Sequence, residues 1–333
     1  MSVADPVGRG WMALLEGAWP EARAAFEEAL AVAETPEALD GLAAAAQWLD
    51  DADTTIRSRE RAYRMFLERG DGELAARTAF HLSLHVLAFR GDPAVASGWQ
   101  RRGRDLLREH PESPWLGAID VGESSIALGY DKDLPRARAL AERGLEAGRR
   151  TGVPDLTIVA KSQLGLVLVG AGEVREGIGH LDEAAAAAMA GEMFEAASAV
   201  TVCCNLVTAC LRIRDFDRAA QWYRHAGALA ESRLAGPFGY PRWEHGSILV
   251  WWGRWDEAER VLLREIDDAA ARPAQAGLAQ LTLADLRRRQ GRFDEAGALL
   301  DDLDARPHRS GLAHLTVAAR AALAFDRGDA ATA

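Results

Sequence analysis

The sequence predicts an all-α protein in which about eight antiparallel helix pairs stack into a right-handed superhelix, an α–α solenoid. Three observations lead to this prediction. The 333 residues are rich in Ala, Leu, Glu and Arg, which favour helices, and poor in the β-branched residues that favour strands. A short phrase with the features of a helix-to-helix turn recurs along the chain. Its copies follow one another at a nearly constant interval, which is typical of repeat proteins.

The recurring phrase is clearest at Gly253–Ala258 and Gly291–Ala296, which both consist of Gly, Arg, an aromatic residue, Asp, Glu and Ala. Glycine can adopt the left-handed conformation that ends a helix, and Asp or Pro favours the start of the next helix. The small residue that closes the phrase lets the two helices approach each other closely. Looser copies occur at Gly17–Ala22, Gly91–Ala96, Gly172–Gly177 and Arg214–Ala219.

The closing residues of the phrase define the repeat, because successive copies lie 34 to 42 residues apart. A large apolar residue commonly follows four positions later, and another small residue lies seven positions before several hinge glycines. The predicted repeat domain therefore spans residues 2–306, with its poorest copy near Ile56. The closing residues are Ala22, Ile56, Ala96, Ala137, Gly177, Ala219, Ala258 and Ala296.

Residues 307–333 are predicted to form the first helix of an incomplete ninth repeat. Apolar residues recur there at helical spacing, and Gly328-Asp329-Ala330 restarts the hinge phrase. The second helix of that pair would lie beyond Ala333, so we expect an apolar face without a partner. That face would carry Leu315, Ala322 and Phe325, so we expect the protein either to self-associate through this end or to be weakly protected from hydrogen exchange there.

These repeats resemble the tetratricopeptide repeat (TPR), although their steps are longer than its usual period of about 34 residues. Several phrases also resemble the helical-repeat region of actinobacterial LuxR-type transcriptional regulators. The resemblance implies a sensor or protein-interaction region next to a DNA-binding helix-turn-helix domain, which this chain does not contain. The phrases are Ala43–Ala62, Phe89–Trp99, Cys203–Trp222 and Leu286–Ala296.

In repeats of this kind the first helix of each pair lines the concave face, so a ligand or partner is expected there. An aromatic cluster beside polar residues in repeats six and seven has the composition of a binding site, because ligands need apolar walls and a few oriented polar groups. Tryptophans that only fill gaps between long helices are the alternative interpretation. The predicted groove residues are His81, His85, Glu123, Gln163, Asn205, Thr208, Arg212, Tyr240, Trp243, Glu244, Trp251 and Arg288.

Motifs that could carry catalysis have simpler explanations. Gly170-Ala171-Gly172 is the repeat hinge and not a nucleotide-binding loop, and Gly122–Ile126 lies within a helix and lacks the closing glycine of a nucleophile elbow. His81 and His85 share a helix face, but no third zinc ligand is evident, so we favour groove-lining histidines over a metal site. Cys203 and Cys210 fall on core positions. We therefore predict no catalytic residue, no metal and no cofactor.

Charge and composition limit the partners. The net charge of −11, from 50 acidic and 39 basic residues, argues against general nucleic-acid binding by this segment. No apolar stretch is long enough for a transmembrane helix, and three cysteines within eight residues suit a reducing cytoplasm. The prediction is a non-catalytic binding module for a protein, a peptide or a small-molecule effector. A free-standing scaffold unrelated to transcription and an enzyme on a helical scaffold are the alternatives.

Overall fold

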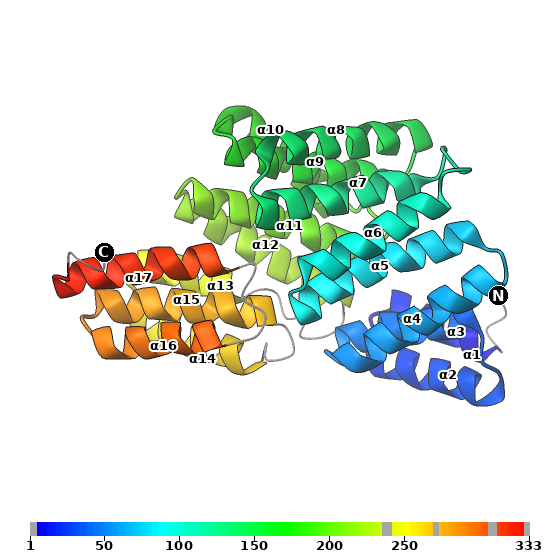
Figure 1. Ribbon diagram of the computed structural model, residues 1–333, viewed down its shortest axis with the longest axis horizontal. Coiled ribbons are helices and arrows are strands. Elements are labelled where there is room, and N and C mark those ends of the chain that lie inside the picture. The colour runs from blue at the N-terminus through cyan, green and yellow to red at the C-terminus, as the bar shows by residue number, and fades with distance from the viewer. Residues whose placement is uncertain (1–4, 235–241, 269–272, 306–311, 330–333) are drawn as a thin grey trace. The chain divides into compact units, whose positions relative to one another are not determined.

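The computed structural model describes residues 5–234, 242–268, 273–305 and 312–329, and these residues form helices and turns without a β-strand (Figure 1). The helices are α1 (Pro6–Leu15), α2 (Trp19–Val32), α3 (Pro36–Trp48), α4 (Ala52–Glu68), α5 (Gly72–Arg90), α6 (Pro93–Leu106), α7 (Pro114–Ile126) with its π-helical extension η1 (Ala127–Asp131), α8 (Leu134–Thr151), α9 (Pro154–Gly170), α10 (Val174–Ala190), α11 (Ala196–Arg212), α12 (Phe216–Leu234), α13 (Arg242–Trp251), α14 (Trp255–Asp268), α15 (Pro273–Arg289), α16 (Phe293–Ala305) and α17 (Ala313–Arg327).

Consecutive helices pack as pairs, from α1 with α2 to α15 with α16, which confirms the predicted all-α fold of about eight TPR-like pairs. First helices of successive pairs also contact one another, as α7, α9 and α11 do. None of the helices that the structure describes combines the length and the apolar character needed to cross a membrane.

The chain divides into two compact units. Unit 1 comprises Met1–Leu87 and Pro93–Phe238, and unit 2 comprises Ala88–Asp92 and Gly239–Ala333. Unit 1 contains most of α1 to α12, and unit 2 contains α13 to α17. Each unit has its own core: in unit 1 one cluster joins α7, α8 and α9, and in unit 2 another joins α13, α14 and α15.

The predicted repeat register is visible in the packing. The hinge glycines have positive φ angles, for example 73° at Gly17, 88° at Gly172 and 74° at Gly291. Seven of the eight closing residues are at most 1% exposed, and the eighth, Gly177, is also buried. The large apolar partner fits against a small residue on the neighbouring helix, since a Cβ added to Gly10 would lie 2.6 Å from the Phe26 ring.

Three hinges place a residue other than glycine in the left-handed region: Asp50, Lys132 and Arg214, with φ angles of 56°, 58° and 60°. The strain is expected to be largest for side chains that cannot bond to their own backbone. We expect Arg214→Gly to raise the free energy of unfolding by about 1 kcal/mol in a urea titration, because glycine removes this strain. Gly172→Ala, the reverse change at an equivalent hinge, should lower it by a similar amount. A loss of stability in Arg214→Gly would contradict this reading of the hinge.

Helix α17 packs one side against its neighbours and exposes another. Leu323 is 5% exposed and belongs to a core cluster with residues of α15 and α16, whereas Leu315 and Phe325 are 39% and 74% exposed. That α17 opens a ninth repeat stays a prediction.

Candidate functional site: the polar face of α11

One face of α11 presents a row of polar side chains at the surface of unit 1. These residues follow one another at intervals of three or four positions, so they lie on one side of the helix. None of the six is buried. Three of them were predicted to line a binding groove. The α11 stripe, as we call it, consists of Glu195, Ser198, Thr201, Asn205, Thr208 and Arg212.

Most of the other described residues of α11 are apolar and buried. Val202, Leu206 and Val207 are inaccessible to solvent, as are Cys203 and Cys210. They pack where α11 contacts α9, α10 and α12. This burial fixes the rotation of the helix about its axis, so the stripe faces away from the core.

Contacts with α9 hold both halves of the stripe in place. The carboxylate of Asp155 accepts the backbone N–H groups of Phe194 and Glu195 at 3.0 and 3.1 Å, at the point where α11 begins. Farther along, the amide nitrogen of Asn205 donates to the Ser162 hydroxyl at 3.0 Å. These bonds position the stripe beside α9, the first helix of the preceding pair.

The two ends of the stripe carry charged side chains that are accessible and partly desolvated. Glu195 is exposed, yet burial by surrounding protein raises its pKa, and the charge of Asp155 raises it further. The charges of Arg77 and Arg59 lower the pKa of Glu195. Helices α5 and α4, which carry these arginines, therefore lie within electrostatic range of the start of α11. Arg212 is also exposed, and burial lowers its pKa.

Polar contacts also join the first helices of other pairs. His85 Nε2 of α5 lies 2.6 Å from the Gln47 oxygen of α3, and the Gln163 amide of α9 donates to Ser124 of α7 at 3.2 Å. His85 and Gln163 are 6% and 3% exposed. These two predicted groove residues therefore stabilise contacts between helices and are not open to solvent.

His81 of α5 has its ring centre 5.8 Å from that of Trp115 on α7 and 6.5 Å from that of His85 on the same helix. Burial lowers the pKa of both histidines well below the usual value, and the positive charge of Arg59 adds to the effect. Both rings are therefore neutral at physiological pH. Among the residues that the structure describes, no group of three His, Cys, Asp or Glu side chains could hold a metal ion.

Glu123 is the predicted residue nearest to a cavity. It pairs with Arg104 at 3.2 Å, and both line a cavity of about 710 Å³ between α6, α7 and α8. Arg104 also pairs with Asp120 at 2.8 Å. The positive charge of Arg104 is thus already compensated by two carboxylates, so it would attract an added anionic ligand only weakly.

The predicted residues of unit 2 have different environments. Trp243 packs against the unit 2 core and Glu244 is 2% exposed, whereas Trp251 is 41% exposed and lies 4.3 Å beneath the Arg289 guanidinium. Arg288 pairs with Asp285 and Asp326. Tyr240 lies outside the described residues. Because Asn205 and Arg212 belong to unit 1, the aromatic cluster around them stays a prediction.

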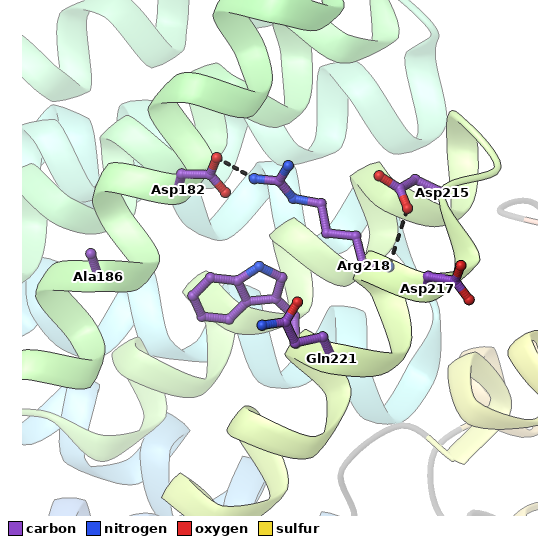
Figure 2. A pocket seen from close by; sticks show the side chains of 7 residues that line it. Asp182, Ala186, Asp215, Asp217, Arg218 and Gln221 are labelled. Carbon is purple, nitrogen blue, oxygen red and sulfur yellow. Dashed lines mark hydrogen bonds and ion pairs between the residues drawn. The ribbon is translucent and has the colours of Figure 1, made fainter.

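A second cavity, of about 510 Å³, opens between α10 and α12 (Figure 2). Asp182 of α10 and Arg218 of α12 point toward each other across it and form an ion pair. Asp215 accepts the backbone N–H of Arg218 at 3.1 Å, as expected of a residue that begins a helix. The ion pair at the centre of this cavity therefore joins α10 to α12, the second helices of two successive pairs.

The cysteines differ in accessibility. Burial raises the pKa of Cys203 to about 11 and that of Cys210 to about 12, whereas Cys204 is partly exposed. At pH 8 we expect iodoacetamide to modify at most Cys204 in the folded protein, because fewer than roughly one in a thousand buried thiols is ionised. Mass spectrometry should find all three modified in denaturant. Equal rates for Cys203 and Cys204 in the folded protein would contradict the assigned core position.

Glu195, Ser198 and Thr201 were not predicted from the sequence. The signal that could have found them is the spacing itself: steps of three and four residues back from Asn205 reach all three. Glu195 begins the helix, and the sequence gives no indication that Arg77 lies nearby.

No family model matches this chain, and no curated protein matches it. Its fold is similar to that of solved structures. A Rap protein complexed with competence and sporulation factor is 15% identical, with a TM-score of 0.61 over 99% of this chain and 95% of that one. The apo form of RapI is 12% identical, with a TM-score of 0.52 over 85% and 96% of the two chains. Aspartyl phosphate phosphatase F from Bacillus subtilis is 13% identical, with a TM-score of 0.51 over 99% and 91%. At such low identities these likenesses concern the fold alone, which is that of a TPR-type α–α solenoid.

Proposed function

We propose that this protein is a non-catalytic binding module that holds an extended peptide segment along the α11 stripe. The observation that carries the proposal is the stripe itself: six polar side chains, none of them buried, along one side of a helix whose apolar residues mostly pack in the core. A buried structural helix has no need for such a row, whereas a partner can bind to it.

The side chains of the stripe suit a peptide backbone, which presents N–H donors and C=O acceptors along its length. Ser and Thr hydroxyls can donate and accept, and an asparagine amide can do both at once. The Asn205 amide donates one hydrogen bond to Ser162, so its other N–H and its oxygen are oriented by a fixed partner. A pre-oriented amide loses little conformational entropy when it binds a ligand.

The fold comparison supports a binding role. A Rap protein of similar fold was solved in complex with competence and sporulation factor. The name of another neighbour includes a phosphatase activity, so an enzyme remains the alternative to a binding module. The link to LuxR-type transcription rests on the sequence phrases alone, because the three neighbours reported above do not bear that name. This link, like a cytoplasmic location, stays a prediction.

The proposal is tested with a soluble random peptide library, from which binders are isolated by affinity selection and identified by mass spectrometry. We expect Asn205→Ala to weaken the binding of a selected peptide about tenfold, since a lost hydrogen bond costs about 1 kcal/mol or slightly more. Calorimetric titration measures this change. The matched control is Gln221→Ala, which removes an exposed amide from α12.

Equal weakening by Asn205→Ala and Gln221→Ala would contradict the assigned site. A lower melting temperature in Asn205→Ala with unchanged affinity would show that the amide only joins α11 to α9. A library that yields no binder would contradict the proposed function.

A further inference from the structure

The α11 stripe carries opposite charges at its two ends. It begins at Glu195, beside Asp155, and ends at Arg212, within electrostatic range of Lys132. The four positions between them are uncharged. This arrangement distinguishes the two directions in which a peptide could lie.

The end at Arg212 has an excess of positive charge. Arg212 is exposed and forms no ion pair with any residue that the structure describes. One of its terminal nitrogens lies 3.5 Å from the position that a Cβ on Gly170 would take, so it extends over the end of α9. Burial lowers the pKa of Lys132, and the nearby charge of Arg212 lowers it further, because two cations disfavour each other.

The acidic residues next to Lys132 are already engaged. Asp131 pairs with Arg136 at 3.0 Å, and Asp133 accepts the backbone N–H of Arg136 at the same distance. Counting these two carboxylates against Arg136, Lys132 and Arg212 leaves one positive charge. An anionic group placed beside Arg212 would relieve the repulsion between Arg212 and Lys132.

The end at Glu195 has an excess of negative charge. Glu195, Asp155 and Asp40 face Arg59 and Arg77, and both guanidinium groups pair with Asp40, at 2.5 and 2.7 Å. Two cations therefore oppose three carboxylates. Ser198 donates a hydrogen bond to Glu195 at 3.3 Å, which fixes its carboxylate at the start of the stripe.

We infer that the α11 stripe binds a short extended peptide in one direction, with its terminal carboxylate at Arg212 and its terminal ammonium at Glu195. The inference rests on the proposed function and adds the length and direction of the ligand. A helix of 17 residues is about 25 Å long, which corresponds to about seven or eight residues of extended peptide. A segment of that length with two free ends matches both charged groups.

The test uses a heptapeptide with free termini, selected from a soluble random library and synthesised in free, C-amidated and N-acetylated forms. We expect amidation to weaken binding to the unmodified protein about tenfold and to have little further effect in Arg212→Gln. Acetylation should weaken binding similarly, with little further effect in Glu195→Gln. The control variants are Arg224→Gln on α12 and Glu192→Gln before α11, which alter exposed charges outside the stripe.

Each outcome has a distinct meaning. If amidation has no effect, or the same effect with and without Arg212, the assigned direction is wrong even when Asn205→Ala still weakens binding. If Asn205→Ala has no effect either, the proposed function itself fails. Glu at the start and Arg at the end of a helix also complement its dipole. Glu195→Gln or Arg212→Gln could lower the melting temperature and leave the affinities of all three peptide forms unchanged. That result would mean that these charges only stabilise the helix through its dipole, and it would overturn the inference.

Discussion

Replacing Asp40 with Ala is expected to lower the free energy of unfolding by about 3–5 kcal/mol, because it leaves a buried charge without its partner. The side chains of Asp40 and Arg59 are 3% and 4% exposed, and their charged atoms lie 2.5 Å apart. Arg77 binds the other oxygen of the same carboxylate at 2.7 Å. Burial lowers the pKa of Arg59 even with Asp40 present, so the guanidinium depends on this carboxylate for compensation.

Urea unfolding measures the effect. Asp53→Ala is the matched control, because Asp53 is 79% exposed and its ion pair with Arg57 is long, at 4.0 Å. This change should alter the free energy of unfolding by less than about 0.5 kcal/mol. The double variant Asp40→Leu with Arg59→Met should regain much of the loss, because it removes both buried charges. A loss below about 1 kcal/mol in Asp40→Ala would show that water reaches Arg59 in the variant.

Gly165→Ala and Gly179→Ala are expected to change stability in opposite directions, although both replace glycine within a helix. A Cβ on Gly165 of α9 would lie 2.7 Å from the Gly177 carbonyl oxygen and 2.8 Å from the Leu181 side chain. A Cβ on Gly179 of α10 would meet nothing within 4 Å. The first change should therefore cost about 2–3 kcal/mol through overpacking, and the second should gain about 0.5–1 kcal/mol from helix propensity.

Thermal or urea unfolding of the two variants gives the comparison directly. Gly98→Ala on α6, also in open space, should behave like Gly179→Ala and serves as a second control. Equal stability of Gly165→Ala and the original protein would mean that α9 and α10 separate at little cost. It would also weaken the explanation of the small residues in the repeat.

The repeat register could be predicted from the sequence because its determinants are local. A glycine at a hinge and an alanine six positions into the phrase have the same function wherever they occur, and the structure buries the alanines as expected. The exceptions are hinges at Asp50, Lys132 and Arg214, where the backbone adopts the left-handed conformation without glycine. Packing on both sides of these hinges imposes a conformation that the residue itself does not favour.

The candidate site was predictable only in part. Asn205, Thr208 and Arg212 follow from helix spacing, but whether a polar residue on a first helix is open or covered depends on distant segments. Gln163 illustrates this: nearly all of the second half of α9 is buried, which no local pattern reveals. The charges around Glu195 come from α3, α4, α5 and α9, so only the tertiary structure brings them together.

Hydrogen bonds between first helices make several contacts between neighbouring helix pairs of unit 1 specific to those pairs. The Gln47 side chain is hydrogen-bonded to the His85 ring, that of Gln163 to Ser124, and that of Asn205 to Ser162. If two of these pairs exchanged places, the amides would lose their partners, and a buried amide such as that of Gln163 would be left unsatisfied at a cost of about 1–3 kcal/mol. The pairs that these bonds join are therefore not interchangeable, and they could not be duplicated or shuffled as freely as those of a consensus repeat array.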